Sequence, residues 1–135
     1  MQKYTSKQVQ ILQPSDKVYN VVSNFNNFTP VLKDQIDGWS ATENSCLFKV
    51  KGIPMKMEIV EKEPSKVVKF VSSGHTPIAF TLWLQLRSLS ENDTRMRLVL
   101  HAEMSLMIKM AVGSKIQDGL DEIAENLAAG FNSYF

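Results

Sequence analysis

The hydrophobic pattern of this chain changes from a period of two to a helical period close to Met104, and this change constrains the fold more than any other feature. Between Gly38 and Met104 apolar residues recur at every second position, as in strands with one buried face. The clearest case is segment 80–86, in which Phe and Leu residues alternate with Thr, Trp and Gln. Turns rich in Gly, Pro, Ser and Asn separate such segments. The pattern predicts an antiparallel meander with one face in the core.

After Met104 the apolar residues recur at helical spacing and form one stripe: Ile108, Val112, Ile116, Leu120, Ile123, Ala124, Leu127 and Phe131. The opposite side carries Lys115, Asp118, Asp121, Glu122 and Glu125. This long amphipathic helix has to bury its stripe, and we expect the apolar face of the sheet to be its partner. Lys109 interrupts the stripe. Either the helix bends at Gly113-Ser114 and moves Lys109 into solvent, or the lysine lies at the entrance of a cavity.

The first part of the chain predicts a strand followed by two short helices. Residues 3–12 form one strand, with Thr5, Lys7, Val9 and Ile11 on one side and Tyr4, Ser6, Gln8 and Gln10 on the other. Apolar residues then follow Pro14 at helical spacing, and Thr29-Pro30 ends that helix before a further helical turn over 31–36. The chain has 135 residues and no linker, so we expect a single α+β domain over residues 1–135.

This order of elements resembles the START-like or SRPBCC superfamily, which includes the birch-pollen allergen and polyketide cyclase/dehydrase-type proteins. The likeness rests on Pro14-Ser15-Asp16-Lys17-Val18-Tyr19, on Phe28-Thr29-Pro30, on Glu61-Lys62-Glu63-Pro64 before Val67-Val68-Lys69-Phe70, and on Phe80 to Leu86 with Asn92-Asp93-Thr94-Arg95-Met96. It implies a helix-grip fold, in which a curved antiparallel sheet of about six to seven strands wraps around the C-terminal helix. Members of the superfamily include lipid and sterol carriers, ubiquinone-binding proteins, cyclases and chaperone activators, so the site has to decide the function.

Composition excludes several classes of protein. With 15 basic and 14 acidic residues the net charge is +1, which argues against a nucleic-acid-binding protein that relies on phosphate contacts. Cys46 is the only cysteine, so no intrachain disulfide forms. Residues 1–25 lack a signal-peptide pattern, and the longest apolar run, Met104 to Val112, is too short to cross a bilayer. We expect a cytoplasmic protein without a transmembrane segment, and the sequence leaves its oligomeric state open.

The sheet face that grips the helix is predicted to carry apolar residues and, apart from the thiol of Cys46, no acid, base or nucleophile. An interior of this kind suits an apolar ligand, because an unpaired charge there would be costly. The expected ligand-binding residues are Phe48, Met57, Phe70, Leu82, Leu84, Met96, Leu98, Leu100, Met107, Lys109, Ile116 and Leu120. Methionines are flexible, and here they fill gaps in a solid core, make a pliable cavity wall or lie on a surface that contacts a partner.

Few residues are candidates for catalysis. His101 shares the strand phase of Arg95 and Arg97 and is expected on the outer face, whereas Cys46 points inward, which excludes a Cys–His pair. His75 lies in a Gly/Pro turn, either at the surface or at the mouth of a cavity. Two histidines and one cysteine on separate elements do not supply a metal site. We therefore expect no catalytic residue, no metal and no cofactor.

The sequence favours non-catalytic binding of a small hydrophobic ligand, lipid-like, isoprenoid or aromatic, in a cavity between the sheet and the C-terminal helix. The first alternative is a polyketide cyclase/dehydrase-type enzyme, in which His75 and either Tyr19 or Lys109 would have to converge on the cavity. The second alternative is a protein–protein interaction module such as a chaperone activator, with a filled core and with Trp83 exposed on the outer face.

Overall fold

The computed structural model describes residues 1–34, 36–50, 52–74 and 78–134, and over these residues eight strands form one antiparallel sheet. The strands are β1 (Gln2–Thr5), β2 (Val9–Ile11), β3 (Ser40–Ala41), β4 (Ser45–Val50), β5 (Ile53–Glu63), β6 (Val67–Ser72), β7 (Ala79–Ser90) and β8 (Asp93–Glu103). Their order in the sheet is β1-β8-β7-β6-β5-β4-β3, and β2 also pairs with β8. The predicted meander is confirmed. The sheet has more strands than expected because the N-terminal strand is divided and β3 adds a short edge.

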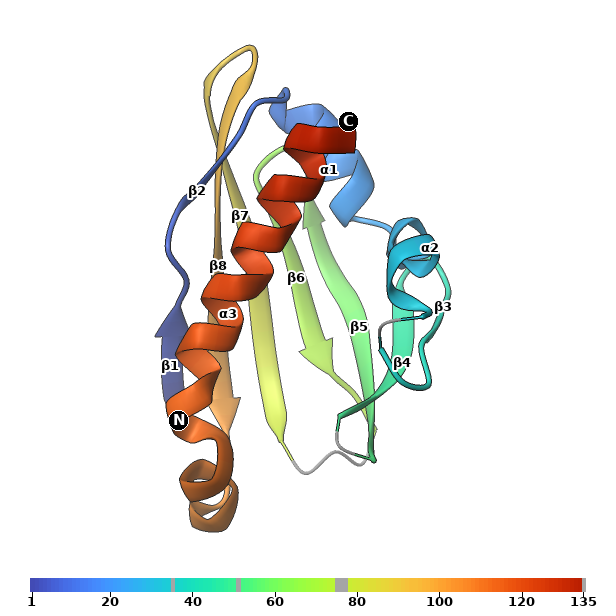
Figure 1. Cartoon of the computed structure of the whole chain (residues 1–135), viewed down its shortest axis with the longest axis vertical. Coiled ribbons are helices and arrows are strands. Elements are labelled where there is room, and N and C mark those ends of the chain that lie inside the picture. The colour runs from blue at the N-terminus through green and yellow to red at the C-terminus, as the bar shows by residue number, and fades with distance from the viewer. Residues whose placement is uncertain (35, 51, 75–77, 135) are drawn as a thin grey trace.

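The helices are α1 (Ser15–Val22), the 3-10 helix η1 (Phe25–Phe28), α2 (Thr29–Leu32) and α3 (Leu106–Tyr134). All of them lie over the same face of the sheet, which we call the inner face (Figure 1). The long helix α3 crosses this face diagonally, and its last turns lie beside α1 (Figure 1). A sheet wrapped around one long C-terminal helix is the predicted helix-grip arrangement, and the α+β fold class is confirmed.

The N-terminal strand is interrupted at Ser6, where the prediction of one continuous strand is wrong. The pairing register with β8 moves by one residue between Thr5, which faces Val99, and Val9, which faces Met96. Ser6 fills the gap, because its hydroxyl accepts a hydrogen bond from the Leu98 N–H at 2.8 Å. A one-residue shift reverses the side-chain phase. The aromatic ring of Tyr4 therefore packs against the core on the same side as Val9.

The fully packed part of the core lies between the inner face and the second half of α3. Its buried members from α1 and η1 are Val18, Val22 and Phe25, and those from α3 are Leu120, Ala124, Ala128 and Phe131. The sheet contributes Val9, Ile11, Cys46, Val68, Phe70, Leu84, Leu86, Met96 and Leu98. The described residues of α3 that precede Leu120 are half-buried or exposed, so close packing stops about halfway along this helix.

Polar side chains of α3 fasten the helix to one edge of the sheet. Gln117 donates a hydrogen bond to the Thr5 carbonyl at 2.8 Å, and Asp121 accepts one from the Lys7 N–H at 2.7 Å. Glu125 forms a salt bridge with Lys7. Further along, Asn132 accepts from the Leu12 N–H and donates to the Gln10 carbonyl. These bonds satisfy backbone groups of the edge strands and hold α3 over β1, β2 and β8 rather than over the middle of the sheet.

Candidate functional site

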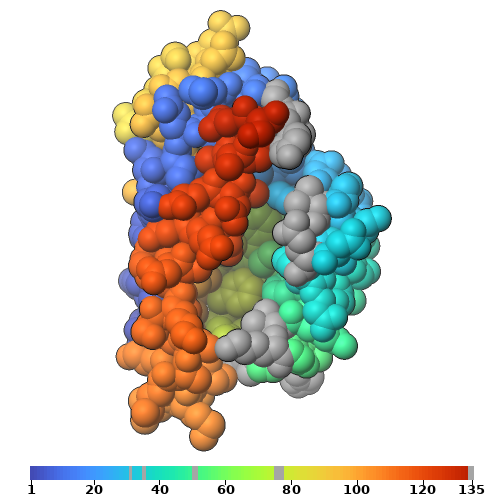
Figure 2. Space-filling model, in the orientation of Figure 1, coloured from blue at the N-terminus to red at the C-terminus, as the bar shows by residue number. Residues whose placement is uncertain are grey.

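Because α3 is held at one edge, a groove remains between its first half and the opposite side of the sheet. Figure 2 shows this hollow between α3 and the side formed by α2 and β4, with the yellow-green atoms of the central strands on its floor. On the floor, Leu82 of β7 pairs with Phe70 of β6 and with Leu100 of β8. Leu82 and Leu100 face inward and pack against the core, yet both are only half-buried. The groove is therefore an apolar concavity that the protein does not fill.

The predicted ligand-binding residues divide into partly exposed positions and positions in the solid core. Phe48 and Met57 from β4 and β5, Leu82 and Leu100 from the floor, and Ile116 from the first half of α3 are half-buried. In contrast, Phe70, Leu84, Met96, Leu98 and Leu120 are packed in the core, each at most 5% exposed. The inward phase expected for the sheet residues agrees with the register of the five strands β4 to β8. Strand alternation identifies the inward-facing residues but cannot tell which of them α3 covers.

Met107 and Lys109 lie elsewhere than expected. The first turn of α3 extends past the end of the sheet (Figure 1), and Met107 is 81% exposed there. Lys109 is exposed as well, and its aliphatic chain lies along Gly113, where an added Cβ would come within 3.3 Å of the lysine Cγ. The helix is unbroken through Gly113 and Ser114. Lys109 is therefore exposed on a helix that continues through Gly113 and Ser114, and Met107 lies outside the groove.

Three residues of this region were missed or given no role by the sequence. Ile59 and Phe80 share the inward strand phase of the predicted ligand-binding set but were not included in it, and both are half-buried. Trp39 follows a glycine in a segment without hydrophobic period, so no signal marked it. Its ring meets Phe25 edge-on at 6.4 Å, and its indole N–H donates to the Thr29 hydroxyl at 2.9 Å. Phe25 in turn contacts Phe70, so a row of three aromatic rings joins the α2 side to the centre of the sheet.

The inner face of the sheet offers little acid–base chemistry. Its buried and half-buried described residues include two ionisable groups, the Cys46 thiol and the Tyr4 phenol. Burial raises the pKa of Cys46 to about 12, so at neutral pH the thiol is protonated and a poor nucleophile. His101 lies on the outer face, as predicted, and its ring contacts Trp83 at 4.7 Å. His75 lies outside the described residues. No group of three or more potential metal ligands occurs within the described ranges.

The outer face of the sheet carries Trp83, as predicted, but this tryptophan is not freely exposed. It is half-buried, with His101 against its edge and the Lys69 ammonium 5.6 Å from its ring centre. These contacts come from neighbouring strands of the same sheet, so Trp83 already has partners within the chain. Its exposure therefore gives the interaction-module alternative little support.

Comparison with solved structures identifies the fold. The norcoclaurine synthase of Thalictrum flavum superimposes with a TM-score of 0.75 at 8% identity, covering 99% of this chain and 94% of that one. The dimeric Aha1 of Colwellia psychrerythraea gives 0.68 at 15% identity, covering 98% of both chains. A START superfamily protein of Mycobacterium smegmatis gives 0.63 at 14% identity, covering 93% of this chain and 98% of that one. No family model and no curated protein sequence matches the chain.

The sheet topology, the edge-held helix and these superpositions define the class: the chain has the START-like, or SRPBCC, helix-grip fold. The predicted resemblance is confirmed at the level of the fold. At identities of 8 to 15% the likeness extends to architecture alone, and each neighbour's name describes that neighbour. Within the described part of the chain, no helix is both long and apolar enough to span a membrane.

Proposed function

We propose that the protein binds a small hydrophobic ligand, lipid-like, isoprenoid or aromatic, in the groove between the inner face of the sheet and the first half of α3. The observation that carries this proposal is the half-exposure of apolar side chains on both walls. Leu82 and Leu100 on the floor face inward and Ile116 lies on the first half of α3, yet all three stay incompletely buried. In a filled core such side chains would be packed against one another.

The lining supports an apolar ligand rather than a charged one. The groove side of β4 and β5 presents Phe48, Met57 and Ile59, none of which can ionise. Met57 has an unbranched, polarizable side chain that adapts to ligands of different shape. The Cys46 thiol, which pairs across the strands with Met57, is protonated at neutral pH and adds no charge. A ligand gains free energy here by covering apolar surface that is otherwise in contact with water.

The test is to fill the groove. Leu82→Trp adds an indole to the floor, and we expect it to abolish binding of the neutral fluorescent probe N-phenylnaphthylamine while the protein stays folded. Thr81→Trp is the matched control, because Thr81 is the preceding residue on β7 and faces the outer side of the sheet opposite His101. This control should bind the probe as the unmodified protein does. Thermal unfolding of both variants establishes that each is folded.

Fatty acids, quinones and flavonoids then compete against the probe. A compound that occupies the groove at 100 times its dissociation constant should stabilise the folded state by about 2.7 kcal/mol. Equal probe binding by the two tryptophan variants would contradict the proposed site. Absence of probe binding and of any thermal shift across all three compound classes would contradict ligand binding altogether.

A further inference from the structure

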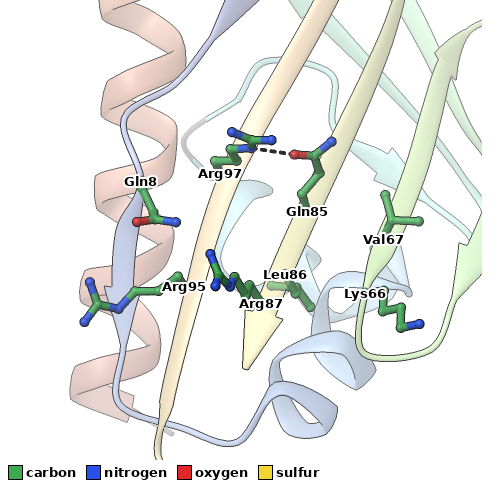
Figure 3. A pocket seen from close by; sticks show the side chains of 8 residues that line it. All are labelled: Gln8, Lys66, Val67, Gln85, Leu86, Arg87, Arg95 and Arg97. Atoms are coloured by element: carbon green, nitrogen blue, oxygen red, sulfur yellow. Dashed lines mark hydrogen bonds between the residues drawn. The ribbon is translucent and has the colours of Figure 1, made fainter. Parts of the chain in front are cut away.

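The outer face of the sheet carries a second concavity, separate from the groove. This hollow has a volume of about 560 Å³ and lies over β6, β7, β8 and the segment between β1 and β2. Its lining residues are Gln8, Lys66, Val67, Gln85, Leu86, Arg87, Arg95 and Arg97. Figure 3 shows side chains of β7 and β8 gathered around it. The hollow is open to solvent, so a soluble ligand can reach it without movement of the chain.

The lining holds four cationic side chains and no carboxylate. Two of these cations have a carboxylate partner outside the hollow: Asp93 binds Arg95 through paired hydrogen bonds of 2.9 and 3.3 Å, and Glu63 lies 3.6 Å from Lys66. The hydrogen bonds from Arg95 lower the pKa of Asp93, which therefore stays ionised at neutral pH. The other two cations, Arg87 and Arg97, have no carboxylate partner among the described residues.

The register of the strands places these arginines against one another. Arg87 lies directly opposite Arg95 on the same face of the sheet, and Arg97 is the next residue of β8 on that face. Like charges at directly opposed positions destabilise a sheet, and here the ion pair with Asp93 offsets the charge of Arg95 but not that of Arg87. Asp93 neutralises one of the three guanidinium groups. Arg97 donates from its Nε to the neutral Gln85 amide at 2.6 Å, which orients the group but leaves its charge uncompensated.

We propose that this hollow is an anion site that takes a small phosphate-bearing compound. Guanidinium groups bind phosphate oxygens in pairs, and Arg87 from β7 and Arg97 from β8 offer two such forks from neighbouring strands. The amides of Gln8 and Gln85 supply further donors at the rim. A phosphate group matches this set better than a single carboxylate, because it offers more acceptor oxygens to the guanidinium donors. The site lies on the opposite face from the groove and does not depend on it.

Calorimetric titration with inorganic pyrophosphate tests the proposal. We expect saturable 1:1 binding at constant ionic strength, weakened about tenfold or more by either Arg87→Gln or Arg97→Gln. Lys115→Gln is the matched control, since it removes the same charge from an exposed position on α3 and should change the affinity less than about twofold. Titration with citrate distinguishes the two anion chemistries, and we expect the tricarboxylate to bind more weakly than pyrophosphate.

Thermal unfolding without ligand gives a second readout. Arg87→Gln removes one member of the opposed pair, so it should leave the melting temperature unchanged or raise it, whereas loss of a structural arginine would lower it. The proposal is overturned if millimolar pyrophosphate gives no saturable heat, or if Lys115→Gln weakens binding as much as the two arginine variants. Tighter binding of citrate than of pyrophosphate would replace phosphate by carboxylate as the recognised group.

Discussion

Cys46 lies on β4 with its side chain 1% exposed, and the surrounding apolar residues determine its chemistry. Burial raises its pKa from the ordinary value of 9.0 to about 12. A backbone hydrogen bond at Met57 acts in the opposite direction, and its effect is the smaller one. The folded state therefore holds the thiol proton more tightly than the unfolded state. That contribution to stability is fully present below pH 9 and declines as the pH rises toward 12.

This pKa predicts the reactivity of the cysteine. At pH 8 the folded protein should be almost inert to iodoacetamide, because both the thiolate population and access to the sulfur are low. In concentrated urea the same thiol should react at the rate of a free cysteine. Mass spectrometry of timed samples measures both rates. Rapid labelling of the native protein would show that the inner face near β4 is open and more polar than described.

Ser6 is a residue-scale feature on which the edge of the sheet depends. Ser6→Ala removes the acceptor of the buried Leu98 N–H and should lower the free energy of unfolding by about 1–3 kcal/mol, the cost of an unpaired buried donor. Urea denaturation measures the loss. Ser88→Ala, at an exposed serine of β7, should change the stability by less than about 0.5 kcal/mol. Equal losses of stability in the two variants would show that the hydrogen bond of Ser6 does not stabilise the edge of the sheet.

Strand phase was predictable residue by residue wherever pairing is regular. The inward set on β7 and β8 follows directly from alternation, and the structure confirms it from Phe80 to Leu86. The predicted phase of the first strand is wrong for the residues before Ser6, because the register shift there involves a hydrogen bond to Leu98, a residue distant in sequence. Alternation within a segment carries no information about such a partner. Tyr4 consequently faced the wrong way in the prediction.

At the scale of elements, α3 was predictable as a helix but its position on the sheet was not. The apolar stripe correctly indicated burial of Leu120, Ala124 and Phe131. It placed Ile123 in the stripe as well, whereas this residue is 52% exposed. Asp121 and Glu125 were assigned to the solvent side, yet they bond the segment between β1 and β2. A periodicity argument treats polar residues as solvated, so it cannot reveal a polar contact that moves the helix to one edge.

The polar contacts that attach α3 to the edge of the sheet predict the effect of a substitution at Asn132, near the end of the helix. Asn132→Ala removes the acceptor of the Leu12 N–H and the donor to the Gln10 carbonyl, and should cost about 1 kcal/mol of stability. Hydrogen exchange at the Leu12 amide should accelerate in parallel. Asn126→Ala is the matched control, because Asn126 is exposed on the same helix. If both variants behave alike, the polar contacts of α3 do not determine where it lies.

For the whole molecule, the groove follows from where the helix is fastened. The second half of α3 closes the core with α1 and η1, and its first half passes over the edge strands and leaves the central floor partly uncovered. The sequence indicated an apolar interior without indicating how much of it would be filled, because filling depends on the lateral position of the helix. The division of the predicted site into packed residues and groove residues has the same cause.

Methyl NMR of the protein titrated with N-phenylnaphthylamine tests this account most directly. Methyl signals of Met57, Leu82 and Leu100 should shift in a saturable way, those of the packed Met96 and Leu98 should shift less, and those of the exposed Met107 and Leu47 should stay in place. Saturable shifts confined to Met107 and Leu47, or equal small shifts throughout, would contradict a ligand-binding groove on the inner face of the sheet.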